Sequence, residues 1–333
     1  MKLFTLLFSV SFLFFSCTEK KTEYKVIDGF AQGGTFHIMF QTSKDSVYDS
    51  DIYDLFAKID ASLSLYSDSS IISRINNNDI SVTTDSLFEE IFKSSIQAHQ
   101  LTSGLFDITV GPLVRAWGFM PEGHLQLDSA KVDSLIRFVG MDKIRLENHR
   151  IIKSDPRIKL DLNAIAQGFT VDKIALYLES KHIKNFIIEL GGEVRTKGIN
   201  DEGKFWKVGI DKPESNEEYR ELQTIVSVSD KSLATSGSYR KFIEENGIKY
   251  SHTVNPKTGY PTHHNLLSVT VIADNCTMAD ALATGIMVMG LKQGKDFVES
   301  HKNIEAYFIY ANDNGSFSTW YSPALKNMIE PVR

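Results

Sequence analysis

Five ionisable side chains stand in apolar or glycine-rich surroundings and are the first candidates for chemistry: Asp107, Asp161, Glu193, His252 and Asp280. They are scattered along the chain, and no Cys/His cluster accompanies them. Carboxylate oxygens without soft ligands favour Mg²⁺ over Zn²⁺. Because Mg²⁺ usually acts on phosphates, these residues indicate chemistry at a phosphate group.

Asp280 lies in a stretch that reads as the first turns of a helix, and it is the only charged residue between Asp274 and Lys292. Residues four apart are neighbours on a helix, so Asp280 and Thr284 share a face. The apolar residues of this helix lie on roughly the opposite face, and they are Leu282, Ile286 and Met289. A carboxylate and a hydroxyl together suit a hard cation such as Mg²⁺.

Thr277 gives this helix a second interpretation. It is a candidate N-cap, with Gly290 as the stop, and Asp280 three residues on completes a capping box in which Asp replaces Glu. Asp280 is therefore either a cap or a metal ligand on local grounds.

Asp107 lies between Phe106 and Ile108, in a stretch from Leu105 to Phe119 that is almost wholly apolar. A carboxylate in such a place must be paired, ligand-bound or locally hydrogen-bonded. Asp161 opens the segment 161–168, which we expect to join a strand to a helix; the helix N-terminus there favours anions, although a tight connection alone explains the small residues.

His252 has two interpretations: a structural histidine, which is the commoner case for a lone His, or an acid/base. The sequence contains no P-loop, G-x-G-x-x-G, H-E-x-x-H, C-x-x-C or G-x-S-x-G motif. A simple dinucleotide fold, a zincin, a thioredoxin and an α/β-hydrolase are therefore not expected.

The charge balance excludes one class of partner. The chain carries 36 basic and 42 acidic residues, a net charge of −6, and a general nucleic-acid binder would show a basic surface. A hydrophobic content of 42% allows a sizeable core in a chain of 333 residues. We expect no nucleic-acid partner.

The N-terminus reads as an export signal. An apolar run from Leu3 to Ser16 is too short to span a bilayer comfortably, and Cys17 follows it directly. This resembles a bacterial lipobox with Phe14 in place of the usual Leu, although an ordinary signal peptide with an accidental Cys is the alternative. We predict a signal peptide over 1–16, a lipidated Cys17 and a tether over 17–28. Cys276 is the other cysteine; we expect it to be buried and apolar, at the start of the helix.

The elements that must position these residues mix many short strands with several helices, without regular β-α-β alternation. This pattern predicts an α+β fold. Helices are expected over 51–63, 85–101, 129–138 and 168–180, and from 277 to the stop at 290. Strands are expected at 23–29, 35–41, 144–146, 151–153, 158–162, 185–190, 193–197, 204–210, 222–229, 232–235, 250–254, 267–273, 306–309 and 316–320.

Seven short motifs follow one another along the chain: Phe106–Val114, Asp161–Gly168, Glu189–Glu193, Ala234–Arg240, Ser251–Pro261, Ser268–Ala273 and Ala279–Thr284. Any one of them alone would be weak, but their shared order is specific. In this order they resemble the ApbE family of bacterial flavin transferases, and the resemblance covers roughly Gly29 to Tyr321.

The resemblance implies an α+β, T-fold-like architecture of mixed, largely antiparallel sheets packed with helices, with FAD in a cleft between two lobes and one domain over 29–333. It implies Mg²⁺-dependent transfer of FMN from FAD to a Thr or Ser hydroxyl of a target protein, with release of AMP. Such targets include redox-pump subunits and related electron-transfer proteins. Family members are often lipoproteins, so the periplasmic face of a bacterial membrane is the expected location.

The family's site residues carry over by position. Asp280 and Thr284 match metal-ligand side chains, Ala164 matches a main-chain carbonyl ligand, and Thr277 is a weaker metal candidate. His252 matches a histidine regarded as catalytic, and Asp280 is an alternative base. The positions that match FAD contacts are Gly33, Tyr66, Leu105, Phe106, Asp107, Asp161, Gln167 and Ser251.

Two positions depart from the family pattern. Gly33 stands where a Met usually precedes Gly-Thr, so it can offer only its backbone to a flavin, and Gln167 replaces a commoner Lys or Glu. Two other functions stay open: Mg²⁺-dependent hydrolysis of FAD to FMN and AMP, and a non-catalytic lipoprotein that binds FAD.

Overall fold

The structure is a computed structural model that describes residues 23–119, 127–213, 221–238, 242–245, 248–251, 253–330 and 332. The predicted signal peptide, the lipidation site Cys17 and the candidate catalytic residue His252 lie outside these residues. None of the helices in the described part of the chain combines the length and hydrophobicity needed to span a bilayer.

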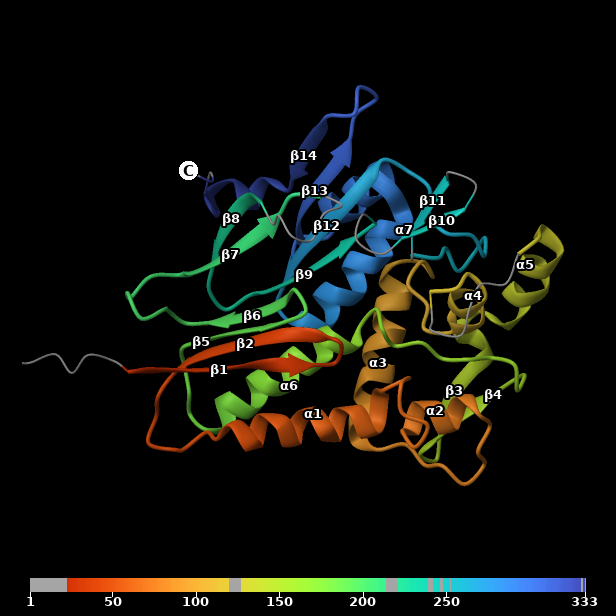
Figure 1. Cartoon of the computed structure of the whole chain (residues 1–333), viewed down its shortest axis with the longest axis horizontal. Coiled ribbons are helices and arrows are strands. Elements are labelled where there is room, and N and C mark those ends of the chain that lie inside the picture. The colour runs from red at the N-terminus through yellow and green to blue at the C-terminus, as the bar shows by residue number, and fades with distance from the viewer. Residues whose placement is uncertain are drawn as a thin grey trace, which may run out of the picture.

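An eight-stranded antiparallel sheet forms the centre of the fold, in the order β1-β2-β5-β6-β9-β12-β13-β14 (Figure 1). β1 begins before residue 29, so the paired part of the chain starts inside the range expected to be a tether. The strands are β1 Tyr24–Ala31, β2 Gly34–Gln41, β5 Phe186–Leu190, β6 Glu193–Lys197, β9 Ser232–Gly237, β12 Leu266–Ala273, β13 Glu305–Ala311 and β14 Phe317–Tyr321.

Three smaller sheets accompany it. A three-stranded sheet has the order β15-β8-β7, and two hairpins pair β10 with β11 and β3 with β4. Their strands are β3 Ile144–Glu147, β4 Arg150–Lys153, β7 Trp206–Asp211, β8 Leu222–Val228, β10 Phe242–Glu245, β11 Ile248–Ser251 and β15 Ile329–Glu330.

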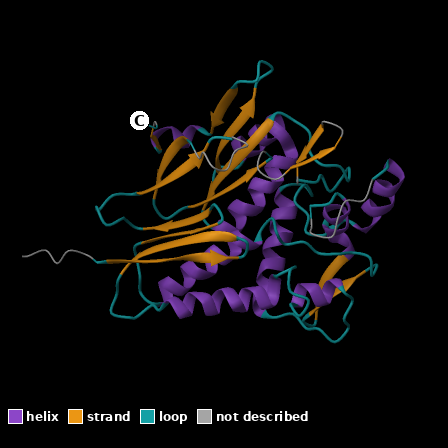
Figure 2. Ribbon diagram, in the orientation of Figure 1, coloured by secondary structure: helices purple, strands orange, loops and turns teal. Residues whose placement is uncertain are grey.

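The helices gather mostly on one side of the large sheet (Figure 2). The longest is α7 Cys276–Ser300, which is interrupted at Gly290. The others are α1 Asp49–Leu63, α2 Ile71–Asn76, α3 Ser86–Leu101, α4 Gly111–Ala116, α5 Ser129–Leu135 and α6 Ala166–Ser180, with short 3₁₀ helices at Ile136–Phe138, Met141–Lys143 and Pro323–Asn327.

Strand alternation lets the large sheet bury both faces. Ala234, Val271 and Phe308 pack with the helices, whereas their neighbours Leu233 and Ile272 pack with the three-stranded sheet. Successive side chains on a strand point to opposite faces, so the same strands build two layers of core. The expected α+β class, with largely antiparallel sheets, is confirmed.

Three local predictions were wrong. Residues 158–162 form no strand; Lys159 makes only an isolated parallel bridge to Val110. α7 does not stop at Gly290, which instead adopts φ 75° and kinks the helix before it continues to Ser300. The N-cap of α7 is Asn275, not Thr277: its side chain accepts a hydrogen bond from the Met278 N–H.

Candidate active site

Asp280 lies in the second turn of α7 with 7% of its surface exposed. Within the described chain its carboxylate accepts one hydrogen bond, from the Gly168 N–H to Oδ2 at 3.0 Å. Burial raises the pKa of Asp280 to about 7, and the Gly168 bond opposes that rise. The capping-box interpretation is therefore wrong, because this carboxylate bonds to another helix and not to the start of its own.

Gly168 explains why α6 and α7 approach so closely. A Cβ at this position would lie 2.4 Å from the Cys276 carbonyl oxygen and 2.8 Å from the Asp280 Cβ. Only glycine leaves room for its own N–H to reach Asp280 at the start of α6. The small residues of the segment 161–168 thus serve a helix-to-helix contact as well as a tight connection.

Thr284 follows Asp280 by one turn, on the same face of α7, as expected. Its Oγ1 lies 3.1 Å from Ser236 Oγ on β9, so two hydroxyls join the carboxylate in this part of the molecule. The opposite face of α7 is in the core, with Leu282 and Ile286 buried and Met289 packed against them. This confirms the predicted amphipathic division of the helix.

Ala164 lies in the turn just before α6, two residues ahead of the helix start. The turn is fixed by the N–H groups of Ile165 and Ala166, which both donate to the Leu162 carbonyl. Ala164 precedes Gly168, which donates to Asp280, by four residues in the sequence. The Ala164 assignment as a metal ligand stays a prediction.

Thr277 is buried and bonds to a residue that the sequence reading missed. Its N–H and Oγ1–H both donate to Asp172 Oδ2 on α6, at 2.8 and 2.6 Å. Asp172 thus holds the first turn of α7, and Thr277 does not cap the helix. A metal-ligand role for Thr277 stays a prediction.

The β1–β2 turn places Gly33, a predicted FAD contact, directly after Gln32, which contacts Gln167, another predicted FAD contact. Gln32 and Gly33 have φ of 49° and 77°, the left-handed pair typical of a tight hairpin. Gln167 Nε2 donates to the Gln32 carbonyl at 3.4 Å. Gly191, after β5, is close too, because a Cβ there would lie 2.6 Å from Gln167 Nε2.

Asp161 and Tyr66 form another predicted pair of FAD contacts. Asp161 is buried, and its burial raises the pKa of its carboxyl, although it accepts a hydrogen bond from the Asn163 N–H at 2.9 Å. Tyr66 is 71% exposed, yet partial burial of its phenol and then the Asp161 charge raise its pKa. The Asp161 carboxylate therefore acts on the phenol of Tyr66 although the two residues are far apart in the sequence.

Leu105, Phe106 and Asp107 run beside Asp161, whose N–H donates to the Ile108 carbonyl at 2.7 Å. Asp107 Oδ1 accepts hydrogen bonds from the Thr109 N–H at 2.7 Å and its hydroxyl at 2.5 Å, and Oδ2 accepts one from the Met141 N–H at 3.2 Å. Burial raises the pKa of Asp107, and these bonds oppose the rise. Its own chain therefore satisfies this carboxylate.

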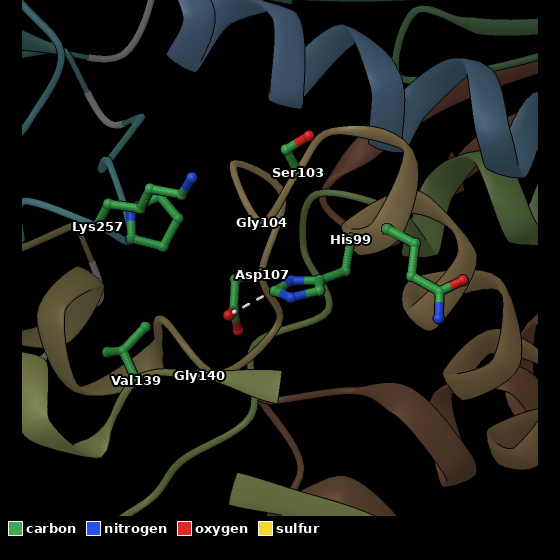
Figure 3. A pocket seen from close by; sticks show the side chains of 9 residues that line it. His99, Ser103, Gly104, Asp107, Val139, Gly140 and Lys257 are labelled. Atoms are coloured by element: carbon green, nitrogen blue, oxygen red, sulfur yellow. Dashed lines mark ion pairs between the residues drawn. The ribbon is translucent and has the colours of Figure 1, made fainter. Parts of the chain in front are cut away.

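A cavity of about 440 Å³ opens beside Asp107 (Figure 3). His99 Nδ1 lies 3.6 Å from Asp107 Oδ2, and Lys257 reaches in from the opposite side. The lining residues are His99, Gln100, Ser103, Gly104, Asp107, Val139, Gly140, Pro256 and Lys257. The cavity thus joins two of the sequence motifs, but its lining does not include Asp280.

Ser251 ends β11, where it pairs with Phe242, and the candidate base His252 follows outside the described residues. The structure thus places most predicted residues in three neighbouring groups: the Asp280 group, the Gly33–Gln167 group and the Asp161–Asp107 group. The last two lie at opposite ends of the segment 161–168. The expected cleft between two lobes stays a prediction.

Reasoning from sequence missed Asp172, Arg195 and Ser236. A signal for Asp172 was present, since it is a carboxylate among Val171, Ile174 and other apolar residues of a helix. The same signal singled out Asp107. Which partner Asp172 finds depends on the packing of α6 against β6 and α7, and sequence spacing does not reveal that.

The donor set around Asp280 fits Mg²⁺. No three His, Cys, Asp or Glu side chains cluster as a metal site within the described residues. Mg²⁺ is commonly bound through one or two carboxylates plus substrate phosphates. A buried carboxylate with one hydrogen bond and neighbouring hydroxyls has this character, because a cation would offset its desolvation.

Comparison with known proteins identifies the family. The ApbE family model matches residues 32–308, which is most of the chain. The fold, the order of the motifs and this match agree, and the chain therefore belongs to the ApbE family.

Two relatives that are named enzymes match this chain along nearly their whole length. The chain is 34% identical to an FAD:protein FMN transferase of Haemophilus influenzae, covering 94% of this chain and 93% of the relative. The Vibrio cholerae FAD:protein FMN transferase is 35% identical, with 95% and 96% covered. The solved structure of the flavin transferase ApbE from Vibrio cholerae superposes with a TM-score of 0.82 at 32% identity, covering 92% of this chain and 99% of the other.

Proposed function

We propose that this protein transfers FMN from FAD to a Thr or Ser hydroxyl of an acceptor protein and releases AMP. The names of its relatives support the transfer of FMN from FAD to protein. The observation that carries the proposal for this chain is Asp280, a buried carboxylate whose one hydrogen bond in the described chain comes from the start of α6. Such a group suits a phosphate-bound cation.

Asp280, Thr284 and the Ala164 carbonyl are the groups that would hold Mg²⁺, with Thr277 as a further candidate. When bound, Mg²⁺ would neutralise negative charge on the FAD pyrophosphate, as in other phosphoryl transfers. Gly168 keeps Asp280 in place through its N–H. The turn at Gly33 and the side chain of Gln167 lie beside this group and are proposed to contact FAD, as are Tyr66, Asp161, the segment 105–107 and Ser251.

The proposed transfer is a displacement at phosphorus, in which no atom changes its oxidation state. The acceptor oxygen forms a bond to the FMN-side phosphorus, the bond from that phosphorus to the bridging oxygen breaks, and AMP leaves with the electron pair. The hydroxyl proton goes to a base, and His252 and Asp280 are the two candidates. A pKa of about 7 would suit Asp280 to this task, whereas metal binding would keep it deprotonated.

Intact-mass analysis tests the proposal. The purified protein is incubated with FAD, Mg²⁺ and an acceptor protein taken from a neighbouring reading frame. We expect an FMN-sized mass increase on the acceptor, formation of AMP, and loss of both with EDTA. AMP without a covalent product would indicate FAD hydrolysis, and FAD binding without AMP would indicate a non-catalytic carrier; either result would contradict flavin transfer.

We also propose that Cys17 is lipidated and holds the protein at the periplasmic face of a bacterial membrane, near redox-pump subunits or related acceptors. The apolar run before Cys17 and the polar residues after it support this location. Replacement of Cys17 by Ala should release the protein from the membrane fraction. An unchanged membrane fraction would contradict the anchor.

A further inference from the structure

Asp172 is a buried carboxylate of α6 that the proposed reaction does not use. It is 7% exposed, and its two oxygens meet four donors from other elements. Oδ1 accepts hydrogen bonds from Arg195 Nη1 at 2.5 Å and the Cys276 N–H at 3.0 Å. Oδ2 accepts the two bonds from Thr277. A carboxylate offers about four acceptor positions, so this one is fully used by the protein itself.

Two of these donors, the N–H groups of Cys276 and Thr277, are the first backbone groups of α7. The initial N–H groups of a helix have no partner within the helix, and a carboxylate satisfies them and interacts favourably with the helix dipole. Asn275 caps the Met278 N–H in the usual local way. Asp172 is different, because it caps α7 from another helix and so fixes where α7 begins relative to α6.

The same two helices meet again one turn earlier on α6 and one turn later on α7. Gly168 precedes Asp172 by four residues on α6, and Asp280 follows Cys276 by four residues on α7. The Gly168 N–H donates to Asp280, and its Cα packs against the Cys276 carbonyl. Asp172 and Gly168 therefore form two adjacent attachments between α6 and α7. A shift of α7 relative to α6 at Asp172 would also move Asp280 relative to Gly168.

We propose that Asp172 is the positioning residue of this site: it holds the first turn of α7 against α6, so that Asp280 meets the start of α6 in the geometry that binds Mg²⁺. Asp172 itself touches neither cation nor FAD, since its oxygens are occupied. Arg195, held on β6, balances its charge. The proposal rests on the Mg²⁺-dependent function proposed above.

The variant Asp172→Asn tests this role because it keeps the size of the side chain and removes the charge. An amide nitrogen cannot accept a hydrogen bond, so at least one attachment of α7 or Arg195 is lost. In the full-length chain with FAD and no acceptor, calorimetric titration should show that Mg²⁺ binds about 10-fold more weakly, the size of effect known for groups that orient metal ligands. At saturating Mg²⁺, kcat should recover to within about threefold.

Glu179→Gln is the matched control. Glu179 is another acid of α6 that lies beside Arg195, at 3.8 Å, and it pairs with Lys197 at 2.8 Å. Within the described chain its carboxylate forms no hydrogen bond or ion pair with α7, so its loss should change Mg²⁺ affinity by less than about twofold. If Asp172→Asn does not fold, Asp172→Glu keeps the charge for Arg195 but displaces the attachment by one methylene, and it should weaken Mg²⁺ binding in the same direction.

Mg²⁺ affinity within twofold of wild type in a folded Asp172 variant would overturn the positioning role. So would equal losses in Asp172→Asn and Glu179→Gln, which would indicate general loosening of α6. Absence of Mg²⁺ binding in the wild-type protein is a different result, because it would contradict the proposed Mg²⁺ site itself.

Discussion

Asp107 and Asp280 are equally buried carboxylates, at 8% and 7% exposure, yet their surroundings differ. Asp107 accepts three hydrogen bonds from Thr109 and Met141 and has His99 nearby. Among the residues that the structure describes, Asp280 accepts one, from Gly168. A buried charge that its own chain satisfies stabilises local structure, whereas one left with a single donor is free to meet a ligand. The comparison therefore favours Asp280, and not Asp107, as the carboxylate that meets a cation.

The largest expected effect is on turnover. Asp280→Asn removes the charge that we propose holds Mg²⁺ and should lower kcat/KM for flavin transfer by at least about 100-fold. Asp296→Asn, an exposed acid further along α7, is the control and should leave turnover unchanged. A wild-type rate for Asp280→Asn would contradict the proposal that Asp280 holds Mg²⁺ during turnover.

Gly168→Ala should damage the contact that presents Asp280. Alanine normally favours a helix over glycine by about 1 kcal/mol, but here its Cβ would meet backbone at 2.4 Å. We expect a net loss of about 2 kcal/mol in the free energy of unfolding, measured by urea denaturation. Gly294→Ala, whose Cβ would meet the Ile286 side chain at 2.8 Å, should lose less because a side chain can move. A larger loss in Gly294→Ala than in Gly168→Ala would contradict the close approach of the α6 and α7 backbones at Gly168.

Asp107→Asn should destabilise the protein, since it leaves the Thr109 or Met141 donors without a full acceptor. A loss of about 1–3 kcal/mol in the free energy of unfolding is expected. Asp280→Asn should not destabilise, because it replaces an under-bonded buried charge with a neutral group. Denaturant titration of both variants compares the two sites directly, and equal losses would mean that both carboxylates are structural.

The free energy of unfolding should depend on pH through the titration of Asp280. Its pKa rises from 3.8 to about 7 on folding, so the folded protein binds this proton more tightly than the unfolded chain. The free energy of unfolding should therefore fall as pH rises from about 4 to 7, by up to about 1.4 kcal/mol per pH unit from this group. The difference between wild type and Asp280→Asn, measured without Mg²⁺, isolates the contribution. A difference that does not vary with pH would contradict the raised pKa.

Much of this architecture could be predicted from sequence, because local patterns determine it. The period of apolar residues predicted the helix at 51–63, and the Gly33-Gly34 turn between two strands predicted the β1–β2 hairpin. The Asp280/Thr284 face also followed from helical spacing. The order of the motifs predicted the family, which the family match confirms, whereas the roles of the isolated polar residues stay predictions.

The failures have a common physical cause in tertiary contacts. The sequence suggests that Thr277 is an N-cap because it does not show that Asp172, on another helix, accepts the hydrogen bonds of the Thr277 N–H and hydroxyl. Gly290 looks like a stop, but His264 Nε2 lies 2.7 Å from the Met287 carbonyl at the kink, where a side chain can satisfy the broken turn. Residues 158–162 have strand-like composition, but only Lys159 finds a bridging partner.

The most direct test of the account is a calorimetric titration of Mg²⁺ into the FAD-bound protein without acceptor, comparing wild type, Asp280→Asn and Asp107→Asn. The account predicts binding by wild type, binding within about threefold of it by Asp107→Asn, and no measurable binding by Asp280→Asn. Wild-type affinity in Asp280→Asn would contradict the central claim that this buried carboxylate holds the cation.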